Sequence, residues 1–145
     1  MIGLIQRVSS ASVVVDGDTI GAIDRGLLVL VGVEKGDSAE NVAKLADRVA
    51  NYRVFSDSAG KMNLSVTDIN AAILAVPQFT LAADTRRGRR PSFSGSADPK
   101  TGKTLFDQWC GVIRERGLAI ETGRFGADMQ VSLVNDGPVT FWLTA

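Results

Sequence analysis

Two short segments of the chain carry polar groups that could act on a substrate. In Gln78-Phe79-Thr80-Leu81, an amide and a hydroxyl alternate with bulky apolar residues, so both are expected on one side of an extended strand. In Asn135-Asp136-Gly137-Pro138-Val139-Thr140, polar residues and a Gly-Pro pair join two apolar stretches. The alternative interpretations are an ordinary edge strand and an ordinary turn.

The composition narrows the chemistry that these segments can perform. The chain has no histidine and a single cysteine, Cys110. Ser-His-Asp and Cys-His catalysis, zinc sites built from His and Cys, and an intramolecular disulfide are therefore excluded. Cys110 is expected to be a small core residue rather than a nucleophile. Catalysis has to use carboxylates, lysine, a Thr or Ser hydroxyl, backbone groups or the substrate itself.

Carboxylates and glycine-rich segments show no organised metal or nucleotide site. The Asp residues fall mostly in turns, where their side chains hydrogen-bond the local backbone, and none has the spacing of a calcium loop. Gly102-Lys103-Thr104 resembles the end of a P-loop, but Ala97 stands where that motif needs its first glycine. We interpret it as the start of a helix and predict neither a metal nor a cofactor.

A basic run forms a local excess of charge in a neutral protein, which has 16 Lys and Arg against 16 Asp and Glu. Arg86-Arg87-Gly88-Arg89-Arg90 places four cations within five residues, and Phe93 follows. Arginine pairs bidentately with phosphate oxygens, and aromatic rings stack on unpaired bases, so the run is compatible with nucleic-acid contact. A solvated loop would have the same sequence, and both interpretations stay open.

Strands are predicted from alternation and turn residues. Residues 2–33 are expected to form three strands in a meander, with a tight hairpin turn at Asp16-Gly17. Leu27–Val31 is apolar throughout, which is typical of a strand buried on both faces. Two further short strands are expected over Tyr52–Phe55 and Ala71–Val76, the second ending at a change of direction near the proline that follows it.

Helical spacing of apolar residues predicts one helix over Ser38–Asn51, with Asp37 and Glu40 as a capping box, and another over about Lys100–Arg116. Two strands separated by a turn are expected at the end of the chain. The predicted fold is α+β: a mostly antiparallel, barrel-like β-sheet with two helices in a single domain, residues 1–145.

No apolar run reaches the roughly 20 residues of a membrane helix, and the first residues lack the basic stretch and apolar core of a signal peptide. We therefore expect a cytoplasmic protein with no membrane partner.

Taken together, the two polar segments resemble the paired signatures of the D-aminoacyl-tRNA deacylases, a Ser-Gln-Phe-Thr-Leu-like strand and a later Asn-x-Gly-Pro-Val-Thr loop. The similarity extends to the opening Met-x-x-x-x-Gln-Arg-Val, the Gly-Leu-Leu-Val-Leu-Val-Gly-Val strand and the stretch Leu81–Arg86, and it covers essentially the whole chain. One position departs from the family, because Pro77 replaces its usual serine and removes a hydroxyl and a backbone N–H.

The resemblance implies a homodimeric hydrolase that cleaves the ester of D-aminoacyl-tRNA, and of glycine mischarged on alanine tRNA, releasing the amino acid and reusable tRNA. Phe79 and Thr80 would be the catalytic positions and Gln78 would bind substrate, with backbone N–H groups steadying the developing oxyanion. The catalytic group would come from the terminal ribose of the tRNA.

The resemblance also implies a cis Gly137–Pro138 bond, whose two carbonyl oxygens would enter the partner subunit's active site and exclude L side chains. Arg7 would brace this loop. Apart from the resemblance, we predict from their charge that the arginines of the Arg86–Arg90 run contact tRNA phosphates. Two alternatives remain open. One is a non-catalytic RNA-binding module that uses the basic run and Phe93. The other is a related deacylase that removes L-alanine from a non-cognate tRNA, in which the Gly-Pro bond would be trans.

Overall fold

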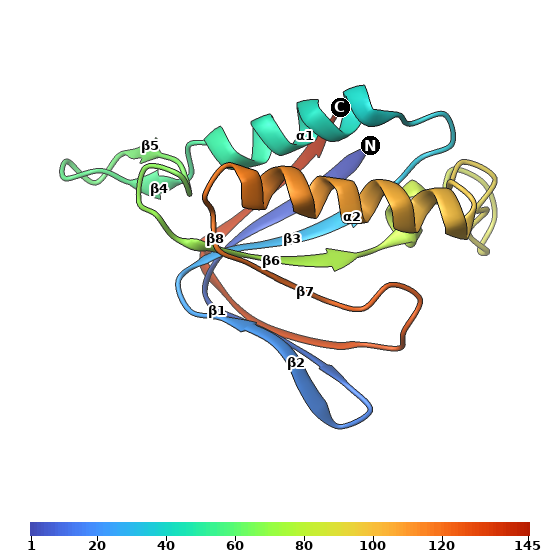
Figure 1. The fold of residues 1–145 in the computed structure, drawn as a ribbon, viewed down its shortest axis with the longest axis horizontal. Coiled ribbons are helices and arrows are strands. Elements are labelled where there is room, and N and C mark those ends of the chain that lie inside the picture. The colour runs from blue at the N-terminus through green and yellow to red at the C-terminus, as the bar shows by residue number, and fades with distance from the viewer.

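Two long helices lie over one face of a curved sheet, and a small two-stranded sheet lies beside them (Figure 1). The computed structural model describes all 145 residues. It confirms the predicted α+β fold with two helices in a single domain. The elements in chain order are β1 (Ile2–Val15), β2 (Asp18–Ile23), β3 (Gly26–Gly32), α1 (Ala39–Asn51), β4 (Phe55–Ser56), β5 (Met62–Leu64), β6 (Ala72–Pro77), the 3₁₀ turn η1 (Phe79–Ala82), α2 (Pro99–Glu115), β7 (Ile120–Thr122) and β8 (Gln130–Thr144).

The large sheet has the strand order β2-β1-β3-β6-β7, with β8 on the other edge of β1. β1 pairs antiparallel with β3 through residues 2–8, with β2 through residues 11–15, and with β8 along most of its length. The pairs β3–β6 and β6–β7 are parallel. A Cβ placed on Gly21 of β2 would lie 3.1 Å from the carbonyl oxygen of Thr122 in β7, so the two ends of this path approach each other. The sheet is therefore nearly closed, like a barrel.

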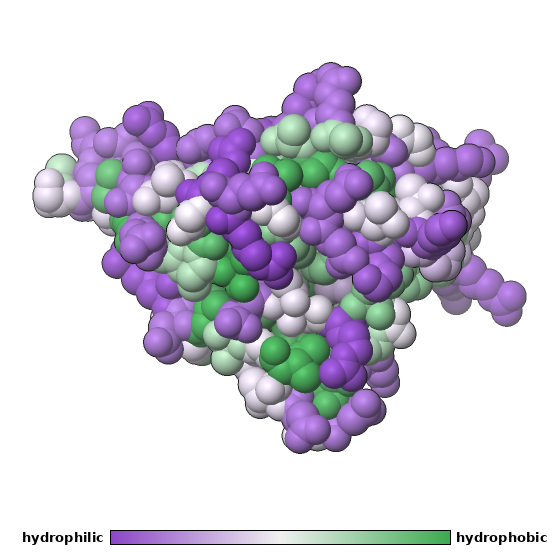
Figure 2. Space-filling view, viewed as in Figure 1, coloured by the Kyte–Doolittle hydropathy of each residue, from purple (hydrophilic) through white to green (hydrophobic).

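Apolar residues fill both faces of this sheet. The larger core lies between the sheet and the two helices, and the smaller one lies inside the curve of the sheet. Leu27, Val29 and Val31 of β3 face the helices, whereas Leu28 faces the inner core. This confirms the prediction of a strand buried on both faces. Figure 2 shows hydrophilic side chains over most of the helical side of the molecule, with an apolar patch below the helices.

The helix starts differ in part from the prediction. α1 is capped by Ser38, whose backbone N–H donates to the Asn41 side chain at 2.9 Å, so the expected capping box of Asp37 and Glu40 is wrong. Asp37 instead accepts a 2.7 Å bond from the α-ammonium group of Met1. α2 begins as interpreted, with the P-loop-like triplet inside its first turns. Neither helix is long and apolar enough to cross a membrane.

Several local expectations are also corrected. The strand predicted over Tyr52–Phe55 is only Phe55–Ser56, and residues 2–33 do not form a meander, because β3 pairs with β1 and not with β2. Residues 78–81 do not continue as an edge strand, because β6 ends at Pro77 and the chain turns into η1. Residues 135–138 do not separate two strands, since β8 runs through them as one strand whose register with β1 shifts. The short strand β7, at residues 120–122, was not predicted. The hairpin turn at Asp16-Gly17 is confirmed, with φ of 51° and 85°.

Candidate active site

The Gln78–Thr80 segment forms the turn that follows β6. The Gln78 N–H donates to the carbonyl of Val31 at 2.8 Å, which holds the turn against the end of β3. Its carbonyl accepts from the Leu81 N–H at 3.2 Å, closing the 3₁₀ turn. The Gln78 side-chain amide donates to the Thr80 hydroxyl at 2.6 Å, so these two polar side chains are brought together at the surface.

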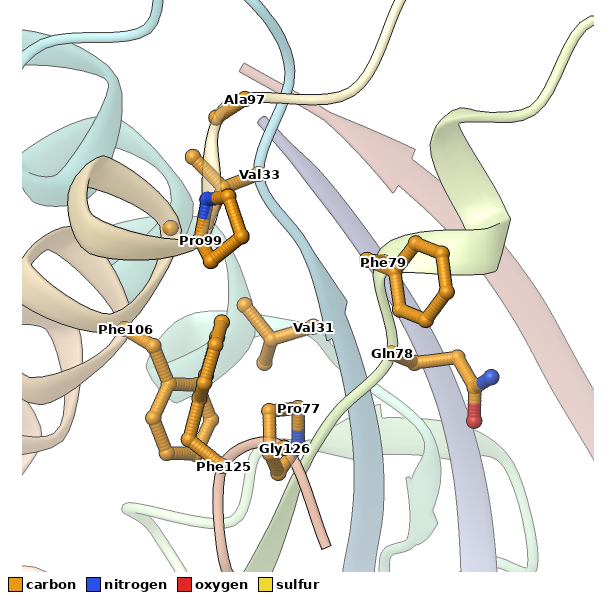
Figure 3. A pocket seen from close by; sticks show the side chains of 11 residues that line it. Val31, Val33, Pro77, Gln78, Phe79, Ala97, Pro99, Phe106, Phe125 and Gly126 are labelled. Carbon is orange, nitrogen blue, oxygen red and sulfur yellow. The ribbon is translucent and has the colours of Figure 1, made fainter. Parts of the chain in front are cut away.

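An apolar cavity of about 230 Å³ opens beside this turn. Figure 3 shows ring and aliphatic side chains from β3, β6, α2 and the segment before β8 gathered around it, while the Gln78 amide points away. Its lining includes Val31, Pro77, Phe79, Pro99, Phe106 and Phe125. A cavity of this size and composition suits a planar or apolar group, and the backbone of the turn at its rim supplies the polar contacts.

Arg7 and the Gly137–Pro138 loop form a second cluster. The Arg7 guanidinium donates to the carbonyl of Val54 at 2.6 Å and to the carbonyl of Asp136 at 3.2 Å, and it also lies 3.2 Å from the Asp136 carboxylate. Gly137 has φ of +118°, and a Cβ placed on it would lie 2.7 Å from Arg7 Nη2. Arg7 therefore packs directly against the loop, and its guanidinium leaves no room for a side chain at position 137.

The side chain of Asn135 holds the same loop from inside. Its amide donates to the carbonyl of Arg7 at 3.0 Å and to that of Val139 at 3.1 Å. Its oxygen accepts from the Thr140 hydroxyl at 3.1 Å. These bonds let β8 pass through a bulge without leaving its pairing with β1. Sequence reasoning placed Asn135 in the motif but gave it no role.

The expected cis bond between Gly137 and Pro138 is corrected by the structure, which contains no cis peptide bond. Before proline the trans form is intrinsically favoured by about 0.5–1 kcal/mol. Here the trans loop is also held by its contacts to Arg7 and Asn135.

Within one chain the two clusters are far apart. Pro77 pairs with Val31, which is aligned with Gly3 of β1, whereas the Gly137 bulge lies opposite Arg7, four residues further along that strand. Four residues of extended chain span about 13 Å along the sheet alone. In Figure 1 the loop after η1 lies at one end of the sheet and β4 lies at the other. Arg7 donates to the carbonyl of Val54, the residue just before β4. One copy of the chain does not bring Gly137 to Gln78.

Comparison with known proteins identifies the family. The model of the D-Tyr-tRNA(Tyr) deacylase family matches residues 4–144. The chain belongs to this family. A D-aminoacyl-tRNA deacylase of Shewanella sp. (strain W3-18-1) is 61% identical over 141 residues, which are 97% of each chain, and one of Shewanella baltica (strain OS185) is 62% identical over the same length. The resemblance drawn from the two motifs is thereby confirmed.

Two solved structures share the fold of this chain. A structure titled c-Myc DNA Unwinding Element Binding Protein has a TM-score of 0.95 and 37% identity, covering 100% of this chain and 99% of its own. A probable eukaryotic D-amino acid tRNA deacylase has a TM-score of 0.86 at 17% identity, covering 99% of this chain and 98% of its own, which shows a shared fold.

The basic run lies in the loop that connects η1 to α2. Arg86 donates from Nε and Nη2 to the two carboxylate oxygens of Asp84, at 2.9 and 2.7 Å. These bonds, and one from the Arg86 backbone N–H, hold the pKa of Asp84 well below its usual range. Sequence reasoning missed this pairing, although an Asp two residues before an Arg is a signal that could have indicated it.

Other candidate groups stay outside the site. Cys110 is buried on α2, and burial raises the pKa of its thiol to about 12, as expected for a core residue. No group of three or more His, Cys, Asp or Glu side chains is placed to hold a metal ion. Phe106 and Phe125 of the cavity were not predicted as site residues. Phe106 belongs to the apolar spacing that predicts the helix over about Lys100–Arg116, and the irregular segment around Phe125 gives no signal.

Proposed function

We propose that this chain hydrolyses the ester bond of D-aminoacyl-tRNA, and of glycine mischarged on alanine tRNA, releasing free amino acid and reusable tRNA. The proposal is carried by 61% identity to D-aminoacyl-tRNA deacylases over 97% of both chains. Residues 1–145 would act as one catalytic domain. We place the activity in the cytoplasm, because aminoacyl-tRNAs are made and used there.

The turn at Gln78–Thr80 is the proposed reaction centre, and the cavity beside it would receive the aminoacyl group and the terminal adenosine. Attack of water on the ester carbonyl carbon moves an electron pair onto the carbonyl oxygen, and this developing oxyanion needs hydrogen-bond donors. The backbone N–H groups of Phe79 and Thr80 open η1, and the first donors of a helical turn have no partner within it. These two groups are our candidates for that role.

The proton transfers would use the tRNA itself. The chain contains no histidine, and no carboxylate hydrogen-bonds the Thr80 hydroxyl, which instead accepts a bond from Gln78. We propose that the 2′-hydroxyl of the terminal ribose helps to activate the attacking water. The proton lost by water is finally taken up by the leaving 3′-oxygen as the ester C–O bond breaks.

Chiral selection would require two copies of the chain. We propose a homodimer in which the Gly137–Pro138 loop of one copy completes the pocket of the other, where its backbone carbonyls exclude an L side chain. The separation of Gly137 from Gln78 within one chain supports this arrangement. β8 also exposes large apolar side chains along its length, at Val134, Phe141 and Trp142, which a second copy could cover.

The test is hydrolysis by the purified protein. D-tyrosyl-tRNA and glycyl-tRNA specific for alanine should be deacylated, while L-tyrosyl-tRNA should be spared. Sedimentation at the assay concentration should give a dimer. Absence of D-tyrosyl-tRNA hydrolysis would overturn the activity, and a monomer with full activity would overturn the shared site.

A complementation experiment isolates the dimer claim. Chains carrying Gly137→Ala are expected to lose discrimination between D- and L-tyrosyl-tRNA, and chains carrying both Gln78→Ala and Thr80→Ala are expected to lose hydrolysis. Purified mixed dimers of the two should hydrolyse D-tyrosyl-tRNA and spare L-tyrosyl-tRNA, because one of their two sites combines an intact turn with an intact loop. If mixing restores nothing, the two clusters do not act across subunits.

A second candidate substrate is L-alanine attached to a non-cognate tRNA. The trans Gly137–Pro138 bond favours this substrate, since a trans bond is expected in a deacylase that removes L-alanine. The identity to D-aminoacyl-tRNA deacylases favours the first proposal. Faster hydrolysis of L-alanyl-tRNA than of D-alanyl-tRNA would decide for the second.

A further inference from the structure

The long loop between η1 and α2 is built as a fixed hairpin. Asp84 and Ser92 exchange two backbone hydrogen bonds of 2.8 and 3.0 Å, which close the segment that carries the arginines. Further along, Gly95 accepts from the Lys35 N–H at 2.8 Å and Ala97 donates to the Val33 carbonyl at 3.1 Å. The loop is therefore fastened at its neck and to the end of β3, and its tip projects from the protein.

The four arginines at this tip are not equivalent. Arg86 donates from Nε and Nη2 to the Asp84 carboxylate, although its side chain is 86% exposed. Arg87, Arg89 and Arg90 form no ion pair in the structure. Only these three therefore offer uncompensated charge to a partner, and the Asp84–Arg86 pair stiffens the neck from which they project.

An aromatic pair lies between this tip and the cavity. The rings of Phe79 and Phe93 have centroids 5.1 Å apart at 52°, and they stay 56% and 42% exposed. The Ser96 hydroxyl donates to the Phe79 carbonyl at 3.2 Å, which ties the loop to the reaction turn. Since Phe79 also lines the cavity, the exposed rings connect the loop that carries the cations to the cavity.

We propose that this surface binds the single-stranded 3′ end of tRNA. Arg87, Arg89 and Arg90 contact its phosphates, and Phe93, supported by Phe79, stacks on an unpaired base next to the terminal nucleotide. Arg86 is a positioning residue that acts through Asp84. The identity of the nucleic acid rests on the proposed function, in which the terminal nucleotide enters the cavity.

The chemistry of the surface favours a single strand over a duplex. Exposed rings can stack only on bases that are not already stacked in a helix, and each such contact is worth about 1–3 kcal/mol. Arginines on the phosphates add affinity without sequence preference, and this contribution weakens as salt rises. A duplex would meet the arginines but leave the rings unused.

Binding of uncharged RNA tests the inference without any hydrolysis. The probes are a short stem-loop RNA with a four-nucleotide unpaired 3′ end and the same stem with a blunt end, measured by fluorescence anisotropy at several KCl concentrations. The wild type should prefer the first RNA by about tenfold. Phe93→Ala should remove this preference and Phe93→Trp should keep it, both with an unchanged salt slope.

The arginine variants separate charge from positioning. Replacing Arg87, Arg89 and Arg90 by Gln should weaken binding and reduce the log–log salt slope by about 2, at about 0.7 per contact. Arg86→Gln should weaken binding with no change of slope. The matched control is Arg114→Gln, an exposed arginine on α2, which should leave affinity and slope at wild-type values.

Each outcome bears on the inference. Equal affinity for both RNAs, or a wild-type slope in the triple variant, overturns it, and a slope reduced by about 0.7 in Arg86→Gln overturns the positioning role. RNA binding as described without hydrolysis of D-aminoacyl-tRNA would refute the proposed function alone. Hydrolysis with wild-type RNA binding in every variant would refute this inference alone.

Discussion

The side-chain amide of Gln78 donates a 2.6 Å hydrogen bond to the hydroxyl of Thr80. A hydroxyl that accepts a bond keeps its own proton and can donate it elsewhere, but it is a poorer nucleophile than one whose proton is drawn off by a base. No carboxylate or amine accepts the Thr80 proton in the structure. This geometry supports the proposal that the pair orients a substrate and that Thr80 does not attack it.

Thr80→Ala should slow single-turnover deacylation of D-tyrosyl-tRNA by about fivefold, since it removes one hydrogen-bonding group worth about 1 kcal/mol and leaves the Gln78 amide without its partner. Thr80→Ser, which keeps the hydroxyl, should stay within about twofold of wild type. Rapid-quench kinetics measures both. Mass spectrometry of the quenched protein should find no aminoacyl ester on Thr80, and its detection would make this residue a covalent nucleophile.

A tRNA that ends in 2′-deoxyadenosine should be a very poor substrate, because the proposed mechanism takes its catalytic hydroxyl from that ribose. Loss of a positioned acid–base group costs about 10²–10⁴-fold in rate. The comparison is made with the same D-aminoacyl group on both tRNAs, and binding of the uncharged tRNAs serves as the control. Normal turnover of the deoxy substrate would show that a group of the protein, and not the 2′-hydroxyl of the tRNA, activates the attacking water.

The elements with strong periodicity were predicted well, while the two motif segments were not. β3 and both helices follow from apolar patterns that a single element explains. Polar and apolar side chains alternate after Pro77, which predicts a strand, yet this segment is a 3₁₀ turn. β6 ends at the proline, and the Gln78 N–H donates to the Val31 carbonyl of the neighbouring strand. Such a long-range bond has no local signature.

The sequence named candidate site residues but did not predict how they are arranged. The residues named from the resemblance fall into two clusters whose separation follows only from the register of β1 with its neighbours. The pairing of Arg86 with Asp84 and the rings of Phe106 and Phe125 around the cavity are also tertiary facts. The resemblance therefore nominated the groups, and sheet register decides which of them can meet within one chain.

Cys110 should be inert in the folded protein. Burial raises the pKa of its thiol to about 12, and the thiolate is the reactive form. Because the folded pKa is raised, the stabilisation from the neutral thiol is complete below about pH 9 and is lost as pH rises above it. At pH 8 a thiol reagent should react only after denaturant is added. Stoichiometric reaction of the native protein would show that α2 opens readily.

The buried amino terminus should be sensitive to its charge partner. The Met1 ammonium group lies 2.7 Å from the Asp37 carboxylate, whose side chain is only 6% exposed. Asp37→Asn should lower the free energy of unfolding by about 3 kcal/mol, since breaking a buried pair leaves one charge uncompensated. Glu34→Gln is the control. Its carboxylate lies 3.0 Å from Met1 but is 43% exposed, so the loss should stay below about 1 kcal/mol. Urea unfolding compares the two, and equal losses would contradict the assignment.

Gly137→Ala tests the loop that is proposed to select the D configuration. Gly137 has φ of +118°, and an added Cβ would lie 2.7 Å from Arg7 Nη2 and 2.8 Å from Val139 Cγ2. Both side chains would have to move, and a φ of +118° is strained for any L side chain, so the cost in stability should be about 1–3 kcal/mol. The displaced loop should then discriminate less between D- and L-tyrosyl-tRNA.

Gly111→Ala is the matched control, because that glycine lies inside α2 with open space around it. This variant should be more stable than wild type by up to about 1 kcal/mol. The ratio of kcat/KM for the two substrates is measured in both variants. A folded Gly137→Ala protein with an unchanged ratio would place chiral selection elsewhere in the site.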